Sequence, residues 1–249
     1  MFGLKPVKKA GAYSYSDRGG REENEDTVQY LSKGKNSTLY AIADGLGGHG
    51  GGKAASQAAI ECVTDFYTST DISNPKEFNI WFQGANQRVL DMQTKECEMK
   101  TTLVTLLIEG STAMWAHVGD SRLYHFVDGR LVSRTFDHSV SQMAVLRGEI
   151  KDEEIRGHCD RNKLLKALGR EETISIDVST IVDISKNEHA FLLCTDGFWE
   201  YVTEADMTKA LKASATASDW VSRMVKILKR NAKPGNDNNS AIAVICKGE

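Results

Sequence analysis

Four aspartates in this 249-residue chain share one sequence context, at the end of an apolar, strand-like run or just before one. Strand ends can bring side chains from distant parts of a sequence to one edge of a sheet. Carboxylates gathered there repel one another unless a cation lies among them, and Mg²⁺ and Mn²⁺ prefer oxygen ligands. The pattern therefore predicts a divalent-metal site. The four residues are Asp44 after 39–43, Asp120 after 115–119, Asp196 after 191–195, and Asp237 before the last apolar run.

The chemistry that such a site would support is attack of water on a phosphate ester. Two cations roughly 4 Å apart lower the pKa of a bridging water and hold the phosphoryl oxygens. Arg21, which opens the acidic stretch 21–26, adds a guanidinium fork suited to bidentate phosphate binding. Each residue alone has a plainer interpretation, because Asp is a common turn former and Arg is commonly a solvated charge. The prediction depends on the whole set.

The predicted strands and helices place these residues at the ends of elements. Apolar spacing predicts a helix at 53–67, and Asn74 followed by Pro75 predicts a helix that starts there and runs to about Thr94. Asp128–Gly129 predicts a hairpin turn. The predicted strands are 12–16, 27–31, 38–43, 101–109, 113–118, 122–127, 131–133, 174–182, 190–194 and 241–246. The other predicted helices are 141–147, 163–168, 204–213 and 219–229.

The order of these elements defines the fold class. Strands in meanders, interrupted by pairs of helices, lack the regular βαβ alternation of a doubly wound fold. They predict an α+β fold with antiparallel sheets and helices packed on the outside. No linker rich in Pro, Gly or Asn divides the chain, so we expect one domain over residues 1–249.

Composition excludes several classes of protein. The formal net charge of −3 argues against a nucleic-acid binder, which usually carries a basic surplus. No apolar run approaches ~18 residues, so no membrane span is expected, and the first residues lack the apolar stretch of a signal peptide. The five cysteines are scattered without a CxxC pair, which favours packed thiols in a reducing cytoplasm over a disulfide framework or a zinc site.

Taken together, the motifs resemble those of the PPM family, also called protein phosphatase 2C, and occur in the family's order over nearly the whole chain. The segment 161–169 resembles bacterial members in particular, and 198–202 resembles phosphatases encoded with type VI secretion systems. His138, within 137–139, also matches a family motif, and we interpret it as a structural residue near the site. The matching motifs are 16–26, 43–50, Thr101-Thr102, 117–122, 195–197 and 237–240.

The resemblance implies a fold, a reaction and a set of metal ligands. The fold would be a central sandwich of two antiparallel β-sheets flanked by pairs of helices, in four layers α-β-β-α. The reaction would be hydrolysis of phosphoserine and phosphothreonine by water activated between two Mn²⁺ or Mg²⁺ ions, with no phosphoenzyme. Asp44 would bridge both ions and the Gly45 carbonyl would bind one. Asp196 and Asp237 would complete the other site, and Asp120 with Asp196 would form a third, weaker one.

The remaining roles implied by the resemblance concern water, phosphate and the leaving group. Glu25 and Asp26 would bind metal or orient metal-bound waters, and Arg21 would hold the substrate phosphate. Eukaryotic members have a histidine directly after the Asp-Gly pair, where this chain has Leu46. The general acid is therefore unassigned; His49 could serve, and a metal-bound water could donate instead.

The resemblance also implies a biological setting. Substrates would be phosphoproteins, and the phosphatase would reverse a cognate Ser/Thr kinase in bacterial signalling. The enzyme would act as a cytoplasmic monomer, without nucleic acid or membrane. The segment 139–161 falls where the family has a flap beside the active site, and it would shape the choice of protein substrate.

Two rival functions remain open. Residues 45–50 fit GxGxxG after a strand and before a helix, as in dinucleotide-binding proteins. Asp44 would then face a pyrophosphate, and no second parallel strand ending in an acidic residue follows. Residues 47–53 mimic a P-loop, but Ala54 stands where Mg²⁺ needs Ser or Thr. The other rival is a catalytically inactive, phosphatase-like binding module, which would have no need of all the metal carboxylates.

Overall fold

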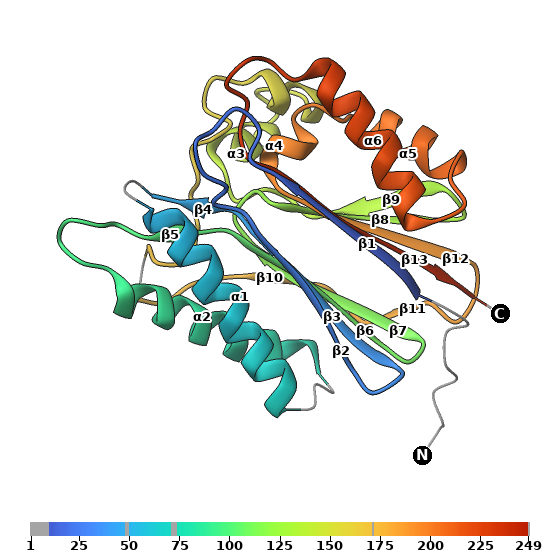
Figure 1. The fold of residues 1–249 in the computed structure, drawn as a ribbon, viewed down its shortest axis with the longest axis horizontal. Helices are drawn as coiled ribbons and strands as arrows, with labels where there is room; N and C mark the ends of the chain where they lie inside the picture. Colours follow the sequence, from blue (N-terminus) through green and yellow to red (C-terminus); the bar gives the residue numbers. More distant parts are fainter. Residues whose placement is uncertain (1–9, 48–49, 71–73, 171, 249) are drawn as a thin grey trace.

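The computed structural model of the chain describes residues 10–47, 50–70, 74–170 and 172–248. Two β-sheets lie face to face, and helices cover the outer face of each (Figure 1). One sheet has the order β1 (Ala10–Asp17), β13 (Asn239–Lys247), β12 (Glu188–Cys194), β8 (Arg122–Val127) and β9 (Arg130–Arg134). The other has the order β10 (Asp177–Val178), β7 (Thr112–Val118), β6 (Leu103–Glu109), β3 (Ser37–Ala43) and β2 (Thr27–Lys33), and β11 (Val182–Asp183) also pairs with β7.

The central strands are apolar on both faces because each separates two cores. In β3, Tyr40 and Ile42 face the core between the sheets, while Leu39 and Ala41 face the helices. In β13 the same alternation sends Val244 to the inter-sheet core and its neighbours toward the other helix pair. Period-2 alternation gives each strand two faces, and here both are buried. The result is three stacked cores, one between the sheets and one beneath each pair of helices.

Both helices that cover the β13 sheet begin at a residue whose side chain caps the helix. α5 (Glu204–Lys212) starts with a capping box, in which Thr203 and Asp206 satisfy each other's backbone N–H groups. α6 (Ala217–Asn231) starts at the N-cap Thr216, whose side chain accepts from the Asp219 N–H. These two helices cover the β13 sheet, and α1 (Gly51–Ser69) with α2 (Phe78–Met92) covers the β3 sheet (Figure 1).

The expected fold class is confirmed. Every strand pairing in the described residues is antiparallel, which excludes a doubly wound parallel sheet and with it the dinucleotide-binding interpretation of residues 45–50. A short 3₁₀ turn at Pro75–Glu77, capped by the Asn74 side chain, precedes α2 as the Asn-Pro signal indicates. None of the described helices has both the length and the hydropathy needed to span a bilayer.

Two predicted elements are wrong. Residues 163–168 form no helix, because their backbone groups pair with other segments: the Leu165 N–H donates to the His138 carbonyl (2.7 Å) and the Leu168 N–H to the Thr101 carbonyl (2.9 Å). The predicted strand 174–182 consists of the short β10 and β11. Between them the Ser179 hydroxyl accepts the Trp115 N–H (2.8 Å), so a side chain replaces a ladder bond.

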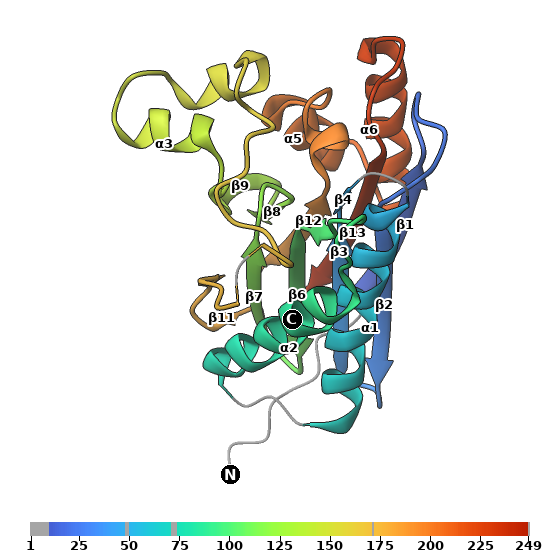
Figure 2. The ribbon, with the colours of Figure 1, turned by 90° about the vertical axis from the view of Figure 1, so that its left-hand side faces the viewer.

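The segment 139–161 contains α3 (Val140–Leu146) and the 3₁₀ helix Asp152–Gly157. Figure 2 shows α3 standing out from the sandwich, beyond β8 and β9. Two ion pairs hold the C-terminal part of the segment to the β13-sheet side: Arg156 Nη2 lies 2.6 Å from Glu204 Oε2, and Arg161 Nη2 lies 2.6 Å from Glu200 Oε2. Glu200 directly follows α4 (Asp196–Trp199), so these contacts bring the segment toward Asp196.

Candidate active site

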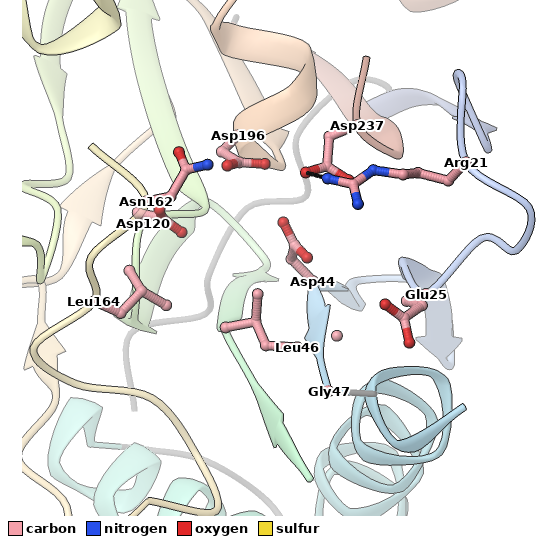
Figure 3. Close-up of a pocket in the computed structure, with 11 residues that line it drawn as sticks. Arg21, Glu25, Asp44, Leu46, Gly47, Asp120, Asn162, Leu164, Asp196 and Asp237 are labelled. Carbon is pink, nitrogen blue, oxygen red and sulfur yellow. Dashed lines mark hydrogen bonds and ion pairs between the residues drawn. The ribbon is translucent and has the colours of Figure 1, made fainter. Parts of the chain in front are cut away.

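The predicted aspartates meet at one end of the sandwich. Asp44 follows β3, Asp120 follows β7, Asp196 follows β12, and Asp237 precedes β13. Figure 3 shows their carboxylates directed into one pocket, with Asp44 opposite Asp196 and Asp237. The pocket has a volume of about 270 Å³ and is lined by Arg21, Glu25, Asp44, Gly45, Leu46, Gly47, Asp120, Asn162, Leu164, Asp196 and Asp237.

Asp44 is fixed by the two threonines of the Thr101-Thr102 motif. The Asp44 N–H donates to Thr102 Oγ1 (3.0 Å), and its carbonyl accepts from the Thr102 N–H (2.9 Å) and Thr101 Oγ1 (2.8 Å). Thr102 Oγ1 also contacts Ser121 Oγ at 2.7 Å, next to Asp120. Because all these partners are buried, the backbone on either side of the Asp44 carboxylate has little freedom to move.

Gly45 is required by close packing. It pairs with Thr101 in the short ladder of β4 (Gly45–Leu46) and β5 (Lys100–Thr101). A Cβ atom at Gly45 would lie 2.1 Å from the Gly52 carbonyl oxygen, in the first turn of α1. Only glycine permits this approach of the site loop to the helix.

Asp26 lies deeper than the pocket-lining carboxylates and is buried. Its Oδ2 accepts from Thr195 Oγ1 (3.0 Å), and Thr195 Oγ1 in turn accepts the Ser240 N–H (3.0 Å). Its Oδ1 is buried without a hydrogen-bond partner in the described part of the chain. An unpartnered carboxylate oxygen beside other carboxylates is the kind of group that a cation or an ordered water satisfies.

Glu25 and Arg21 depend on a residue whose role the sequence did not reveal. Asn238 Oδ1 accepts the Glu25 N–H (2.8 Å), and Asn238 Nδ2 donates to the carbonyls of Arg18 and Glu23 (both 2.8 Å). Asn238 thereby ties the 18–25 loop to the start of β13. Arg21 Nη2 lies 2.8 Å from Asp237 Oδ2, and the Arg21 side chain is 56% exposed. Its guanidinium can therefore meet a phosphate that enters the pocket.

Behind Asp120 lies a fully buried ion pair. Arg122 donates from Nε to Asp137 Oδ1 (2.8 Å) and from Nη2 to Asp137 Oδ2 (2.7 Å), and its guanidinium lies 3.5 Å from the centre of the Trp199 ring. Trp199 Nε1 donates to the Asp120 carbonyl (3.0 Å). The bidentate pair and the indole therefore brace the loop that carries Asp120.

The carboxylates disfavour one another's charge. Burial, followed by the charges of Asp26 and Asp196, raises the pKa of Asp44 well above its usual value. Burial and then Asp237 raise the pKa of Asp196 to about 6, and burial raises the pKa of Asp26 to about 7. The pKa of Asp120 is also raised well above 3.8 by burial and then by Asp196. A site built this way favours protons or cations over free carboxylates.

The donor set fits hard divalent cations. The candidate ligands are all oxygens, namely the carboxylates of Asp44, Asp196 and Asp237 and the backbone carbonyl of Gly45, which also lines the pocket. Mg²⁺ and Mn²⁺ take such ligands and retain waters of their own, so few protein ligands suffice. The unpartnered Oδ1 of Asp26 and the raised pKa values are the independent signs that positive charge belongs here.

The structure brings together most of the predicted site residues. Arg21, Glu25 and Gly45 line the pocket with the four aspartates, and Asp26 lies behind them. His49 lies outside the described residues. The sequence did not single out Asn162 and Leu164, which line the wall opposite Asp237 (Figure 3). The only available signal was the resemblance of 161–169 to bacterial relatives.

A second cluster of candidate ligands, His117, His138 and Asp177, lies nearby. His138 Nδ1 accepts the Gly119 N–H (3.2 Å), so the proton of the neutral ring is on Nε2, which faces Asp177 Oδ1 at 3.4 Å. A metal ion would need the lone pair that this tautomer lacks. Burial lowers the pKa of His138 to about 4, which agrees with a neutral ring. We therefore interpret the cluster as a support for the backbone before Asp120 rather than as a metal site.

Comparisons with known proteins agree with this geometry. A model of the protein phosphatase 2C family matches residues 15–239. The serine/threonine phosphatase stp of Listeria monocytogenes serotype 4b is 33% identical over 238 residues, which are 92% of this chain and 93% of that protein.

Two solved structures illustrate the likeness of the fold. The catalytic domain of the serine/threonine protein phosphatase PstP, in complex with two manganese ions, is 27% identical with a TM-score of 0.79 and covers 96% of this chain and 98% of its own. PppA, described as a key regulatory component of the type VI secretion system in Pseudomonas aeruginosa, is 25% identical with a TM-score of 0.78, covering 96% of this chain and 99% of its own. The chain therefore belongs to the protein phosphatase 2C (PPM) family, and it is a metal-dependent phosphatase of phosphoserine and phosphothreonine in proteins.

Proposed function

We propose that two Mn²⁺ or Mg²⁺ ions bind in the pocket, with Asp44 as the ligand common to both. The Gly45 carbonyl completes one ion's protein ligands, and Asp196 and Asp237 complete the other's. The observation that supports this most strongly is the convergence of these carboxylates on one pocket; among the described residues that line the pocket, Arg21 at Asp237 is the one cation. The ions would supply Lewis acidity, lower the pKa of a water and offset phosphoryl charge.

Asp120 is the proposed ligand of a third, weaker cation, shared with Asp196. Both lie on the side of the pocket next to Asn162 (Figure 3). Since the charge of Asp196 contributes to the raised pKa of Asp120, a cation between them would relieve that repulsion. This position is peripheral to Asp44, which is consistent with a weaker site.

The protein's own side chains then orient the reactants. Arg21 binds the substrate phosphate through its exposed guanidinium, exchanging one contact with Asp237 for charge-assisted bonds to the ester. Glu25 and Asp26 bind metal or orient water at the inner wall, with Asp26 held by Thr195. These roles require the phosphate to enter with its leaving oxygen toward the open rim, where the rest of a protein substrate has space.

Proton donation to the leaving group is the least constrained step. Leu46 lines the pocket at the position of the eukaryotic histidine and cannot donate a proton. We propose His49 for this role. His49→Gln should lower the rate of phosphopeptide hydrolysis, because the alkoxide leaving group needs a proton. The rate with p-nitrophenyl phosphate should stay unchanged, because its leaving group needs none. Equal effects on both substrates would remove His49 from the mechanism.

The biological assignment extends these roles to the cell. We propose that the protein reverses a Ser/Thr kinase in a bacterial cytoplasmic signalling pathway, acting as a single-domain monomer with 139–161 as a flap that selects substrates. All five cysteines are free thiols, which supports a reducing compartment. The likeness to PppA supports, as one form of this pathway, the regulation of a secretion system.

The decisive experiment separates the enzyme from an inactive binding module. Wild type and Asp44→Asn are assayed on p-nitrophenyl phosphate with Mn²⁺ and with EDTA, and phosphopeptide binding is measured in parallel. The proposal predicts Mn²⁺-dependent turnover that EDTA abolishes and Asp44→Asn reduces by roughly 10³-fold or more. Turnover that survives EDTA or the substitution would contradict the mechanism. Tight phosphopeptide binding without any turnover would favour the binding module.

A further inference from the structure

A second groove lies immediately beside the catalytic pocket and has no role in the chemistry described so far. It has a volume of about 300 Å³, enough for one or two side chains, and its lining is mainly apolar. Leu165 and Ile174 both line it, and Leu165 is 42% exposed. Lys166 and Arg170 add two cations to the same lining.

The groove and the catalytic pocket share one stretch of backbone. Leu164 lines the catalytic pocket, and the next residue, Leu165, lines the groove. Arg170 Nη1 donates to the Leu164 carbonyl (2.6 Å), so a groove cation holds the wall between the two cavities. Because consecutive Cα atoms are about 3.8 Å apart, the linings of the two cavities adjoin at this point of the backbone.

The groove is formed before any ligand binds. The residues next to its lining are held by the Asn86 side chain, which accepts the Gly169 N–H (2.8 Å), and by Gln83, whose Nε2 donates to the Glu172 carbonyl (2.7 Å). The Leu165 N–H is bonded to the His138 carbonyl (2.7 Å). A peptide that enters would therefore not have to order these segments, which lowers the cost of binding.

The charged side chains of the groove indicate the chemistry of the segment that it binds. Within the part of the chain that the structure describes, no carboxylate forms an ion pair with Lys166 or Arg170. The catalytic pocket a residue away is strongly acidic, so this basic spot is a local reversal of charge. We infer that the groove binds the segment of the phosphoprotein substrate that flanks the phosphoresidue. This inference rests on the dephosphorylation proposed for the pocket. In that segment, an aliphatic side chain packs against Leu165 and an acidic residue pairs with Lys166 and Arg170.

The test uses phosphothreonine peptides that differ only in the flanking pair. Leu-Asp, Leu-Asn or Leu-Lys is placed on the N-terminal or the C-terminal side, and kcat/KM is measured by phosphate release with Mn²⁺. In one of the two positions the Asp peptide should exceed the Lys peptide by about ten-fold, as expected for one or two partly exposed charge pairs replaced by repulsion. Equal kcat/KM for Asp and Lys peptides on both sides would overturn the groove proposal.

Variants locate the effect on the protein. In Lys166→Glu, with each rate normalised to that variant's own turnover of p-nitrophenyl phosphate, the preference should shift toward the Lys peptide. The matched control Lys226→Glu, a lysine of α6 on the other helix layer, should keep the wild-type preference. A preference unaltered in Lys166→Glu would overturn the assignment. Absence of p-nitrophenyl phosphate turnover in wild type would instead refute the proposed function itself, so the two failures are distinguishable.

Discussion

Replacing Asp26 with asparagine should stabilise the metal-free protein above neutral pH, and the stability of the variant relative to wild type should grow with pH. The Asp26 carboxylate is buried beside Asp196 and Asp237, and nothing in the described chain bonds to its Oδ1. In the absence of metal, ionisation of Asp26 therefore destabilises the folded state. An asparagine side chain in its place keeps an oxygen that can accept from Thr195 and carries no charge.

The magnitude follows from the two pKa values. Burial raises the pKa of Asp26 from 3.8 in the unfolded chain to about 7 in the folded protein. An acid with a raised folded pKa loses stability as pH rises, because the unfolded chain releases its proton first. The loss begins near pH 3.8 and is complete above about pH 7, where it amounts to ~4 kcal/mol at about 1.4 kcal/mol per pKa unit. The variant has no such loss.

The difference between wild type and variant is the quantity to measure, because contributions from titrating histidines cancel in it. Urea unfolding in EDTA at about pH 5 and about pH 8 should show the variant gaining roughly 3 kcal/mol on wild type between the two conditions. The unpaired amide hydrogen of the asparagine costs about 1–3 kcal/mol at both pH values, which leaves the pH dependence unchanged.

Two comparisons complete this test. Saturating Mn²⁺ should shrink the pH dependence, because a bound cation balances the carboxylate charge. Asp91→Asn, an exposed carboxylate at the end of α2, should show no comparable change. If the gap between wild type and the Asp26 variant is the same at both pH values, Asp26 is not held in the destabilised environment described above.

Three further substitutions test the supports of the site. Asp137→Ala removes the bidentate partner of the buried Arg122 guanidinium and should cost about 3–5 kcal/mol, lowering Tm by roughly 6–20 °C in a thermal melt; a change of about a degree or two would be inconsistent with this. Gly45→Ala forces a Cβ to within 2.1 Å of the Gly52 carbonyl oxygen and should reduce kcat/KM about 10²-fold while circular dichroism stays native; near-normal activity would refute the required close approach. Arg21→Ala removes charge-assisted phosphate contacts and should lower phosphopeptide kcat/KM about 10- to 100-fold with stability unchanged, whereas unaltered kinetics would place the phosphate elsewhere.

The fold class and the convergence of the aspartates were predictable because they follow from periodic patterns. In a buried central strand such as 37–43, successive side chains face two different cores, and the residue that follows the strand lies at the end of the sheet. Asp44 and Asp196 are found by this rule alone. The antiparallel order of strands in the two sheets then places the ends of β3 and β12 at the same end of the sandwich.

The parts that were not predictable depend on contacts between distant segments. Residues 163–168 have helical spacing, but the His138 and Thr101 carbonyls capture their N–H groups. The role of Asn238 depends on the Glu25 N–H, 213 positions away in the chain, and no local pattern encodes that bond. The second groove likewise forms only when 165–175 folds over α2.

The central claim is that acidic side chains from separate strands hold two divalent cations at one end of the sandwich. Anomalous diffraction at the manganese edge, from crystals grown with Mn²⁺, tests it most directly. The account predicts two strong peaks in the pocket between Asp44, Asp196 and Asp237, and their loss in Asp44→Asn crystals. An active wild-type enzyme whose manganese peaks lie outside this pocket, or that shows none, would contradict it.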